Sequence, residues 1–244
     1  MTPDQHYRAT QYPYSIPDYS FVFDQGETKP VRTKNEMPDL TGRTPVIACG
    51  SNLSHERLLQ KYGEKAEPLP VIRIQLNDFD TVYAAHIARY GAVSATLHPS
   101  PGTTVSLAIN WLSETQLTRM HETEADNYHY CKLGNLELTP EFGPSLTEAY
   151  AYIGTAGCWA PNEKPIPLAA VRADNRRWEA HHQESVQQLA HQRLAPDGTL
   201  RDFIHANIND GQSRETHARM LQQTTQTFSY TFTEVLEMGV QPAE

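Results

Sequence analysis

From Thr44 onward, apolar and polar residues alternate with the two-residue period of β-strands. The clearest run is 105–111, whose odd-numbered positions are all apolar: Val105, Leu107, Ile109 and Trp111. Three earlier runs, 71–76, 81–87 and 92–98, are further strand candidates. The segment from Pro99 to Gly102 has the composition of a turn that would join the strands at 92–98 and 105–111 as a hairpin.

The pattern after residue 124 predicts more short elements. Residues 128–133 and 135–139 are expected to form a second hairpin, and 148–155 another strand. Helices are expected at 172–194 and about 214–223, and a strand at 228–232. Many short strands joined mostly by short turns favour an α+β fold, a small mixed β-barrel flanked by helices.

Residues 113–124 are predicted to form a short helix that carries an acid on its apolar side. Ser113 and Gln116 make a capping-box start. Leu117, Met120 and Glu124 then fall on one stripe. Apolar neighbours and the negative end of the helix dipole both disfavour a carboxylate, so we expect the pKa of Glu124 to rise toward the range of a general base or acid. The alternative is a solvated last turn on a surface helix.

A strand, a glycine turn and a helix start meet at residues 45–62. The apolar run 45–49 leads into Gly50-Ser51-Asn52, and 53–62 has helical spacing. Such a junction points several backbone N–H groups at one spot and predicts an anion-binding site. The alternative is that the turn needs these residues only for its own conformation.

Residues 1–44 differ from the rest in being rich in both proline and aromatic residues. The prolines argue against regular elements, while the aromatic content exceeds that of an ordinary disordered tail. We expect an arm that packs along its own core or crosses to a second subunit as part of a homodimer. The predicted organisation is this arm, a main domain at 45–195 and a C-terminal extension of helix and strand at 196–244.

The composition of the chain limits the kinds of ligand and site that we expect. The formal net charge of −9 argues against a nucleic-acid or anionic-membrane surface and favours a small-molecule ligand. No signal peptide or membrane span is apparent, so the expected location is cytoplasmic. Three cysteines without CxxC spacing indicate neither a disulfide framework nor a zinc site. Cys49 as a nucleophile remains an alternative to Cys49 as a small buried side chain. The histidines lack metal-ligand spacing, and no metal is expected.

The turn and the helix together resemble the γ-glutamyl cyclotransferase family, γ-glutamylamine cyclotransferases included. Its members carry Tyr-Gly-Ser-Asn-Leu after the first strand, and an acid at the end of a Leu-x-x-Leu-Asp-x-x-Glu helix that a tyrosine follows. Here these stand as Cys49 through Leu53, Leu117 through Glu124, and Tyr128 or Tyr130. The resemblance covers about residues 45–194. Cys49 and His121 depart from it, since the family has tyrosine and aspartate at these positions.

The resemblance implies the release of 5-oxoproline from a γ-glutamyl amino acid or γ-glutamylamine by attack of the substrate's own α-amine. Glu124 would be the general base and acid, and backbone N–H groups of the turn would bind the oxyanion. The implied substrate-binding residues are Cys49, Gly50, Ser51, Asn52, Leu53, Tyr128 and Tyr130. No cofactor is implied. The alternatives are a non-catalytic small-ligand-binding protein on the same fold and an interaction protein that works through the arm.

Overall fold

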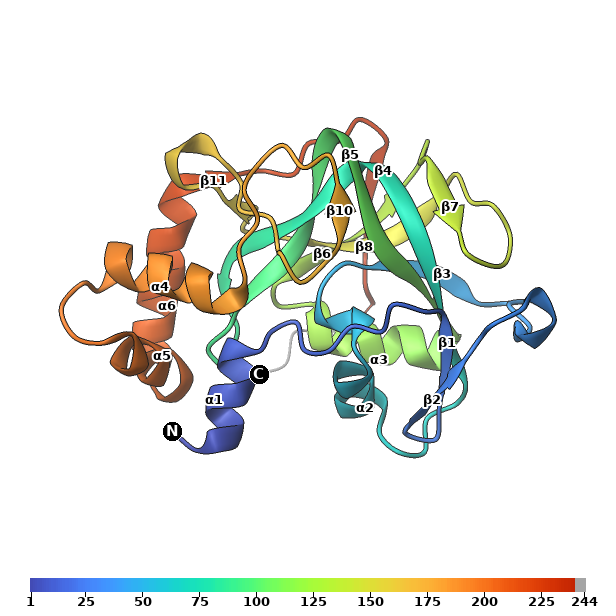
Figure 1. The fold of residues 1–244 in the computed structure, drawn as a ribbon, viewed down its shortest axis with the longest axis horizontal. Coiled ribbons are helices and arrows are strands. Elements are labelled where there is room, and N and C mark those ends of the chain that lie inside the picture. The colour runs from blue at the N-terminus through green and yellow to red at the C-terminus, as the bar shows by residue number, and fades with distance from the viewer. Residues whose placement is uncertain (240–244) are drawn as a thin grey trace.

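Two long antiparallel strands, β4 (Leu69–Ile87) and β5 (Val93–Leu112), lie at the centre of a twelve-stranded sheet in the computed structural model, which describes residues 1–239 (Figure 1). The main strand order is β11-β9-β4-β5-β3-β8-β6-β12. The other strands on this path are β3 (Thr44–Ala48), β6 (Tyr128–Leu133), β8 (Ala149–Gly154), β9 (Cys158–Trp159), β11 (Thr225–Gln226) and β12 (Thr233–Leu236). Four short strands pair alongside: β1 (Phe21–Asp24), β2 (Glu27–Pro30), β7 (Leu138–Pro140) and β10 (Ala173–Asp174).

The sheet is open within residues 1–239. Its two end strands, β11 and β12, do not pair with each other, whereas a barrel requires the first and last strands to join. β3 and β8 are parallel and the other pairs on the path are antiparallel, so the sheet is mixed. The α+β class is therefore confirmed and the closed barrel is not.

The four strands predicted between residues 71 and 111 are two. β4 spans both 71–76 and 81–87, and β5 runs on through 99–102, so the predicted turn there is wrong. The connection lies at 88–92, where the Ala88 N–H donates to the Ala92 carbonyl. Proline lacks an N–H and is therefore tolerated in a β-sheet where the pairing of strands is irregular. Pro99 pairs with Phe79, just after a bulge at Asp78, whose φ is 64°.

The predicted hairpin of 128–133 and 135–139 is also wrong. β6 pairs with β8 on one side and with β12 on the other. β7, which covers the end of the second predicted strand, pairs with β4 instead. Residues distant in the sequence therefore supply the partners, and local spacing could not identify them.

Six α-helices cover the described part of the sheet, in two groups (Figure 1). α2 (His55–Tyr62) and α3 (Glu114–Glu124) contact each other, and α3 contacts β5. The second group gathers at the other end of the sheet and comprises α1 (Pro3–Thr10), α4 (Gln183–Leu194), α5 (Leu200–Asn209) and α6 (Gly211–Leu221). The capping box predicted for α3 is confirmed, because Ser113 and Gln116 bond reciprocally.

The helix predicted at 172–194 starts only at Gln183. Arg176 explains the difference. Its guanidinium forms an ion pair with buried Asp80 at 3.0 Å and donates to the backbone carbonyls of Leu168 and Val171. These contacts hold the preceding segment as a folded connection against β4, so the local helical tendency is overridden by tertiary structure.

The proline-rich arm contains regular elements, contrary to expectation. Pro3 stands in the first turn of α1, where a missing N–H costs no hydrogen bond, and Thr2 caps the helix. β1 pairs with the start of β4 and buries Phe21 and Phe23 in the core. Tyr12, between these elements, is also buried. The arm thus packs on its own chain.

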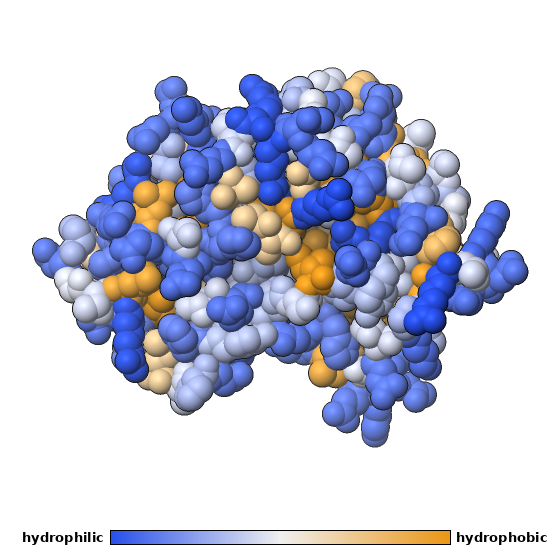
Figure 2. Space-filling view, in the orientation of Figure 1, coloured by the Kyte–Doolittle hydropathy of each residue, from blue (hydrophilic) through white to orange (hydrophobic). Residues whose placement is uncertain are grey.

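The C-terminal strand is β12, a few residues later than the predicted 228–232, and residues 240–244 of the predicted extension lie outside the described residues. The face in Figure 2 is mainly hydrophilic with small separate apolar patches, as expected when the large apolar side chains lie in the core. None of the helices within residues 1–239 has the length and apolar character that crossing a bilayer demands.

Candidate functional site

The N-terminal arm packs against the glycine turn that follows β3. Ser51–Leu53 form one turn of 3₁₀-helix, and Ser54 then caps α2 by accepting from the Arg57 N–H. Tyr12 accepts a hydrogen bond from the Ala95 N–H at 3.0 Å, and its hydroxyl lies directly against Gly50. A Cβ at Gly50 would collide with that hydroxyl. Close approach of the Tyr12 hydroxyl therefore favours glycine at this position.

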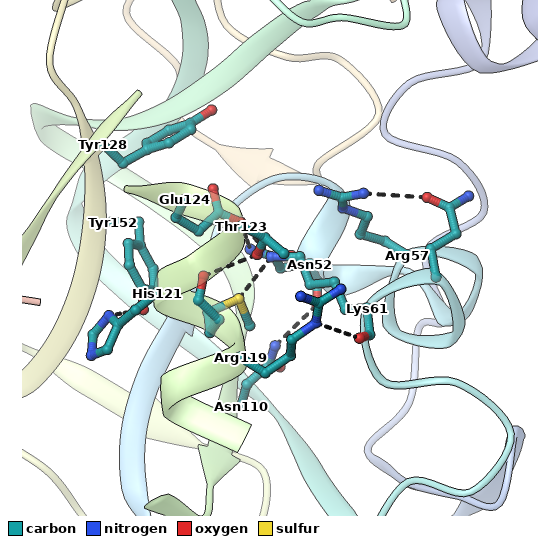
Figure 3. Close-up of polar contacts among 12 residues, drawn as sticks. Asn52, Arg57, Lys61, Asn110, Arg119, His121, Thr123, Glu124, Tyr128 and Tyr152 are labelled. Atoms are coloured by element: carbon teal, nitrogen blue, oxygen red, sulfur yellow. Dashed lines mark hydrogen bonds and ion pairs between the residues drawn. The ribbon is translucent and has the colours of Figure 1, made fainter. Parts of the chain in front are cut away.

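The last residue of α3, Glu124, points inward toward this turn (Figure 3). Its side chain is only 10% exposed. Asn52 Nδ2 donates to Glu124 Oε1 at 3.2 Å, and Lys61 Nζ contacts the same oxygen in a buried ion pair. Glu124 is therefore no solvated surface acid. Its surroundings are also not the purely apolar stripe expected from the sequence, because Lys61 and Asn52 both contact its carboxylate.

A cavity of about 630 Å³ joins the turn to the end of α3. Six predicted site residues line it: Cys49, Gly50, Ser51, Asn52, Glu124 and Tyr128. The other two predicted binding residues lie elsewhere, since Leu53 is buried in the core and Tyr130 stacks on Tyr150. Cavities of about 600 and 670 Å³ at other places contain none of the predicted residues, so chemistry and not volume singles out this one.

Burial shifts the pKa values of several ionisable groups near the cavity. Burial raises the pKa of the Cys49 thiol to about 12, and nearby Glu124 adds to this shift. Burial lowers the pKa of Lys61 to about 8, against the opposing effect of Glu124, and lowers that of His86 to about 4. Burial also raises the pKa of Tyr128. A neutral thiol is a poor nucleophile, so the site disfavours the cysteine alternative.

The side chain of His121, which departs from the family pattern, makes no hydrogen bond to Glu124 within residues 1–239. Its Nδ1 lies 2.8 Å from the Tyr152 hydroxyl, and its ring packs edge-on against Tyr130 with centroids 4.7 Å apart. Tyr152 in turn lines the cavity. His121 therefore anchors α3 to β6 and β8, and Lys61 and Asn52 hold the carboxylate itself.

Sequence reasoning missed the cavity residues that come from distant elements. Arg8 and Tyr12 belong to the arm, His86 to β4, and Arg214 to α6. Nothing local marks these residues. Lys61 did carry a signal, because it falls three residues after Leu58 on the buried side of α2. The rule that selected Glu124 in α3 would also have selected Lys61.

Four buried polar atoms of residues that line the cavity have no hydrogen-bond partner within residues 1–239: Arg8 Nε, Asn52 Oδ1, Arg57 Nε and Ser94 Oγ. Buried polar groups are rarely left unpaired, so these atoms are suited to a polar ligand. In the same part of the chain, no cluster of three or more His, Cys, Asp or Glu side chains could hold a metal ion. The arrangement can bind a small polar molecule and exchange a proton with it through Glu124.

Solved structures to which the chain is similar include the following two. One is the solution structure of At5g39720.1 from Arabidopsis thaliana, with 13% identity over 64% of this chain and 87% of that one, at a TM-score of 0.37. The other is a gamma-glutamyl cyclotransferase, with 14% identity over 78% and 91%, also at 0.37. No family model and no curated protein matches the sequence. We therefore take the function from the cavity and not from these likenesses.

Proposed function

We propose that the protein is a γ-glutamyl cyclotransferase that uses Glu124 as general base and acid. The observation that carries the proposal is the contact of Asn52, in the glycine turn, with Glu124 at 3.2 Å inside one cavity. The two motifs that resemble the family lie 72 positions apart in the sequence and converge on one carboxylate. The proposed chemistry needs a turn whose backbone N–H groups can donate hydrogen bonds, and a buried acid close to that turn.

The proposed reaction is an internal acyl transfer. The α-amine nitrogen attacks the γ-carbonyl carbon, a ring C–N bond forms, and the original amide C–N bond breaks. Glu124 takes the proton that the α-amine must lose and returns it to the departing nitrogen, so protons balance. Backbone N–H groups of Gly50 to Asn52 are the donors that we assign to the oxyanion. The products are 5-oxoproline and an amine or amino acid.

The test is 5-oxoproline release from a panel of γ-glutamyl dipeptides and γ-glutamylamines. Glu124→Gln keeps the shape but cannot accept the proton, so kcat should fall by about 10²–10⁴ while substrate still binds. Glu114→Gln, on the exposed first turn of the same helix, is the matched control and should keep the parent's rate. Equal rates in both variants would remove the proposed role of Glu124.

A second candidate function is ligand binding without turnover. The ion pair with Lys61 favours it, because a carboxylate that is already paired is a weaker base than a free one. Calorimetry on the same panel separates the two functions. Binding without 5-oxoproline at any pH supports the binding protein, and product release supports the enzyme.

A further inference from the structure

Lys61 is a buried cation, and within residues 1–239 the hydrogen-bond partners of its Nζ atom both lie on α3. Its side chain is 1% exposed. Nζ contacts Glu124 Oε1 and lies 2.8 Å from Met120 Sδ (Figure 3). An ammonium group strongly disfavours burial unless an opposite charge accompanies it, and a thioether is a weak acceptor. The contact with Glu124 is therefore what permits a lysine at this position.

The two oxygens of Glu124 have different roles in this geometry. Oε1 accepts from both Lys61 Nζ and Asn52 Nδ2. Oε2 accepts no hydrogen bond from residues 1–239, although Glu124 lines the cavity. One oxygen is thus occupied by the protein, and the other is available to a ligand.

We propose that Lys61 is a positioning residue for the reaction, which fixes Oε1, keeps Glu124 ionised and leaves Oε2 to take the proton of the substrate's α-amine. The inference deepens the proposed function and rests on it. The resemblance assigns no role to this lysine, and the lysine lies outside the glycine turn. It acts through Glu124 and does not line the cavity itself.

Neighbouring ionisable groups do not supply Glu124 with the positive charge that Lys61 supplies. On α3, Arg119 is paired with Glu122 at 2.7 Å. On α2, Arg57 Nη1 donates to Gln60, and Tyr62 is a neutral phenol whose pKa burial raises. Across the cavity, burial favours the neutral forms of His86, Tyr128 and Tyr152. Lys61 is thus the cation in direct contact with the carboxylate.

The buried pair also affects the nucleophile. A substrate α-ammonium that approaches Oε2 meets the carboxylate with the Lys61 cation behind it. A second positive charge disfavours the protonated amine, as a neighbouring cation does for any buried ammonium. Lys61 therefore promotes the neutral amine that must attack, while it keeps the base unprotonated.

The experiment compares Lys61→Met, Lys61→Arg and the exposed control Lys65→Met. One readout is the pH profile of kcat/KM for 5-oxoproline release. Loss of the cation should move the acid limb of Lys61→Met upward by roughly 1–3 pH units, the usual effect of an opposite charge on a carboxyl group. The kcat/KM of Lys61→Met would then fall about tenfold for each pH unit below this limb and would recover at higher pH. Lys61→Arg and Lys65→Met should keep the limb close to the parent's.

A second readout does not depend on turnover. The carboxyl carbon of ¹³C-labelled Glu124, assigned by its loss in Glu124→Gln, should titrate at a higher midpoint in Lys61→Met than in the parent. An unchanged midpoint overturns the inference whatever the assay shows. A rate that falls equally at all pH values also overturns it, because a structural defect acts in that way. Absence of product from the parent on every substrate overturns the proposed function, and with it the role of Lys61 in the reaction.

Lys61→Met leaves a carboxylate buried without its cation, and this variant can fail to fold. The double variant Lys61→Met with Glu124→Gln removes both charges and serves as the second measurement. A melting temperature of the double variant above that of Lys61→Met supports the pairing. Additive losses in the two single variants and the double variant overturn it.

Discussion

At the scale of single residues, the site depends on which atoms approach each other and not on which residue types are present. Cys49 is a thiol beside a candidate base, yet burial raises its pKa to about 12 and keeps it protonated. Glu124 is a buried acid, yet Lys61 and Asn52 supply the charge and the hydrogen bond that offset its burial. Gly50 is small because the Tyr12 hydroxyl occupies the space that a side chain would need.

The contact between Gly50 and Tyr12 gives a paired prediction. Gly50→Ala should lower the free energy of unfolding by about 1–3 kcal/mol, because the new methyl group collides with the Tyr12 hydroxyl. Tyr12→Phe alone should cost about 1 kcal/mol through the lost hydrogen bond from Ala95. In the double variant the next atom of the ring lies 3.5 Å away, so the loss should be smaller than the sum. Urea denaturation measures all three, and strict additivity would show that the collision is relieved elsewhere.

At the scale of elements, α4 ties the arm to the hairpin turn of the long strands. Gln187 is buried, and its Nε2 donates to the Ala9 carbonyl at 3.0 Å and to the Gly91 carbonyl at 2.9 Å. One amide group therefore joins the end of α1, the β4–β5 turn and α4. Both α1 and this turn carry residues that line the cavity, Arg8 and Tyr90. The shape of the site depends on helix docking some distance from Glu124.

Gln187→Ala tests this junction. Two buried carbonyl groups lose their donor, so the free energy of unfolding should fall by about 2–4 kcal/mol. Gln188→Ala, the neighbouring and less buried position, should change it by less than about 0.5 kcal/mol. The comparison is made by thermal and urea denaturation. Similar values for the two variants would mean that water or another side chain replaces the Gln187 amide.

At the scale of the whole molecule, burial of histidines makes stability depend on pH. Burial lowers the pKa of His98, on β5, to about 4, and that of His86 to about 4 as well. In the unfolded chain a histidine titrates near 6.5. Between these values the unfolded state binds more protons than the folded state, so stability is complete above about pH 6.5 and is lost as the pH falls toward 4.

His98→Gln isolates the contribution of one histidine. In the parent, the free energy of unfolding should fall between pH 6.5 and 4, with His98 contributing on the order of 2 kcal/mol. His98→Gln should show a smaller fall over the same interval, whereas exposed His6→Gln should keep the parent's pH dependence. Chemical denaturation at several pH values provides the measurement. An unchanged pH dependence in His98→Gln would show that folding does not change the pKa of His98.

The sequence alone determined the features that depend on near neighbours in the chain. The start of α3 followed from the reciprocal bonds of Ser113 and Gln116, and the inward direction of Glu124 followed from its spacing after Met120. The strand–turn–helix junction at Gly50 was equally local. Six of the eight predicted site residues line one cavity for this reason.

The tertiary structure alone decided the features that depend on distant partners. The pairing of β6 with β8 and β12, the open sheet and the late start of α4 each depend on contacts between residues far apart in the chain. The same holds for the approach of Tyr12 to Gly50 and of Lys61 to Glu124, over 63 positions in the second case. Periodicity states which face of an element is buried and not what it is buried against, so only the folded chain could show that a lysine meets this acid.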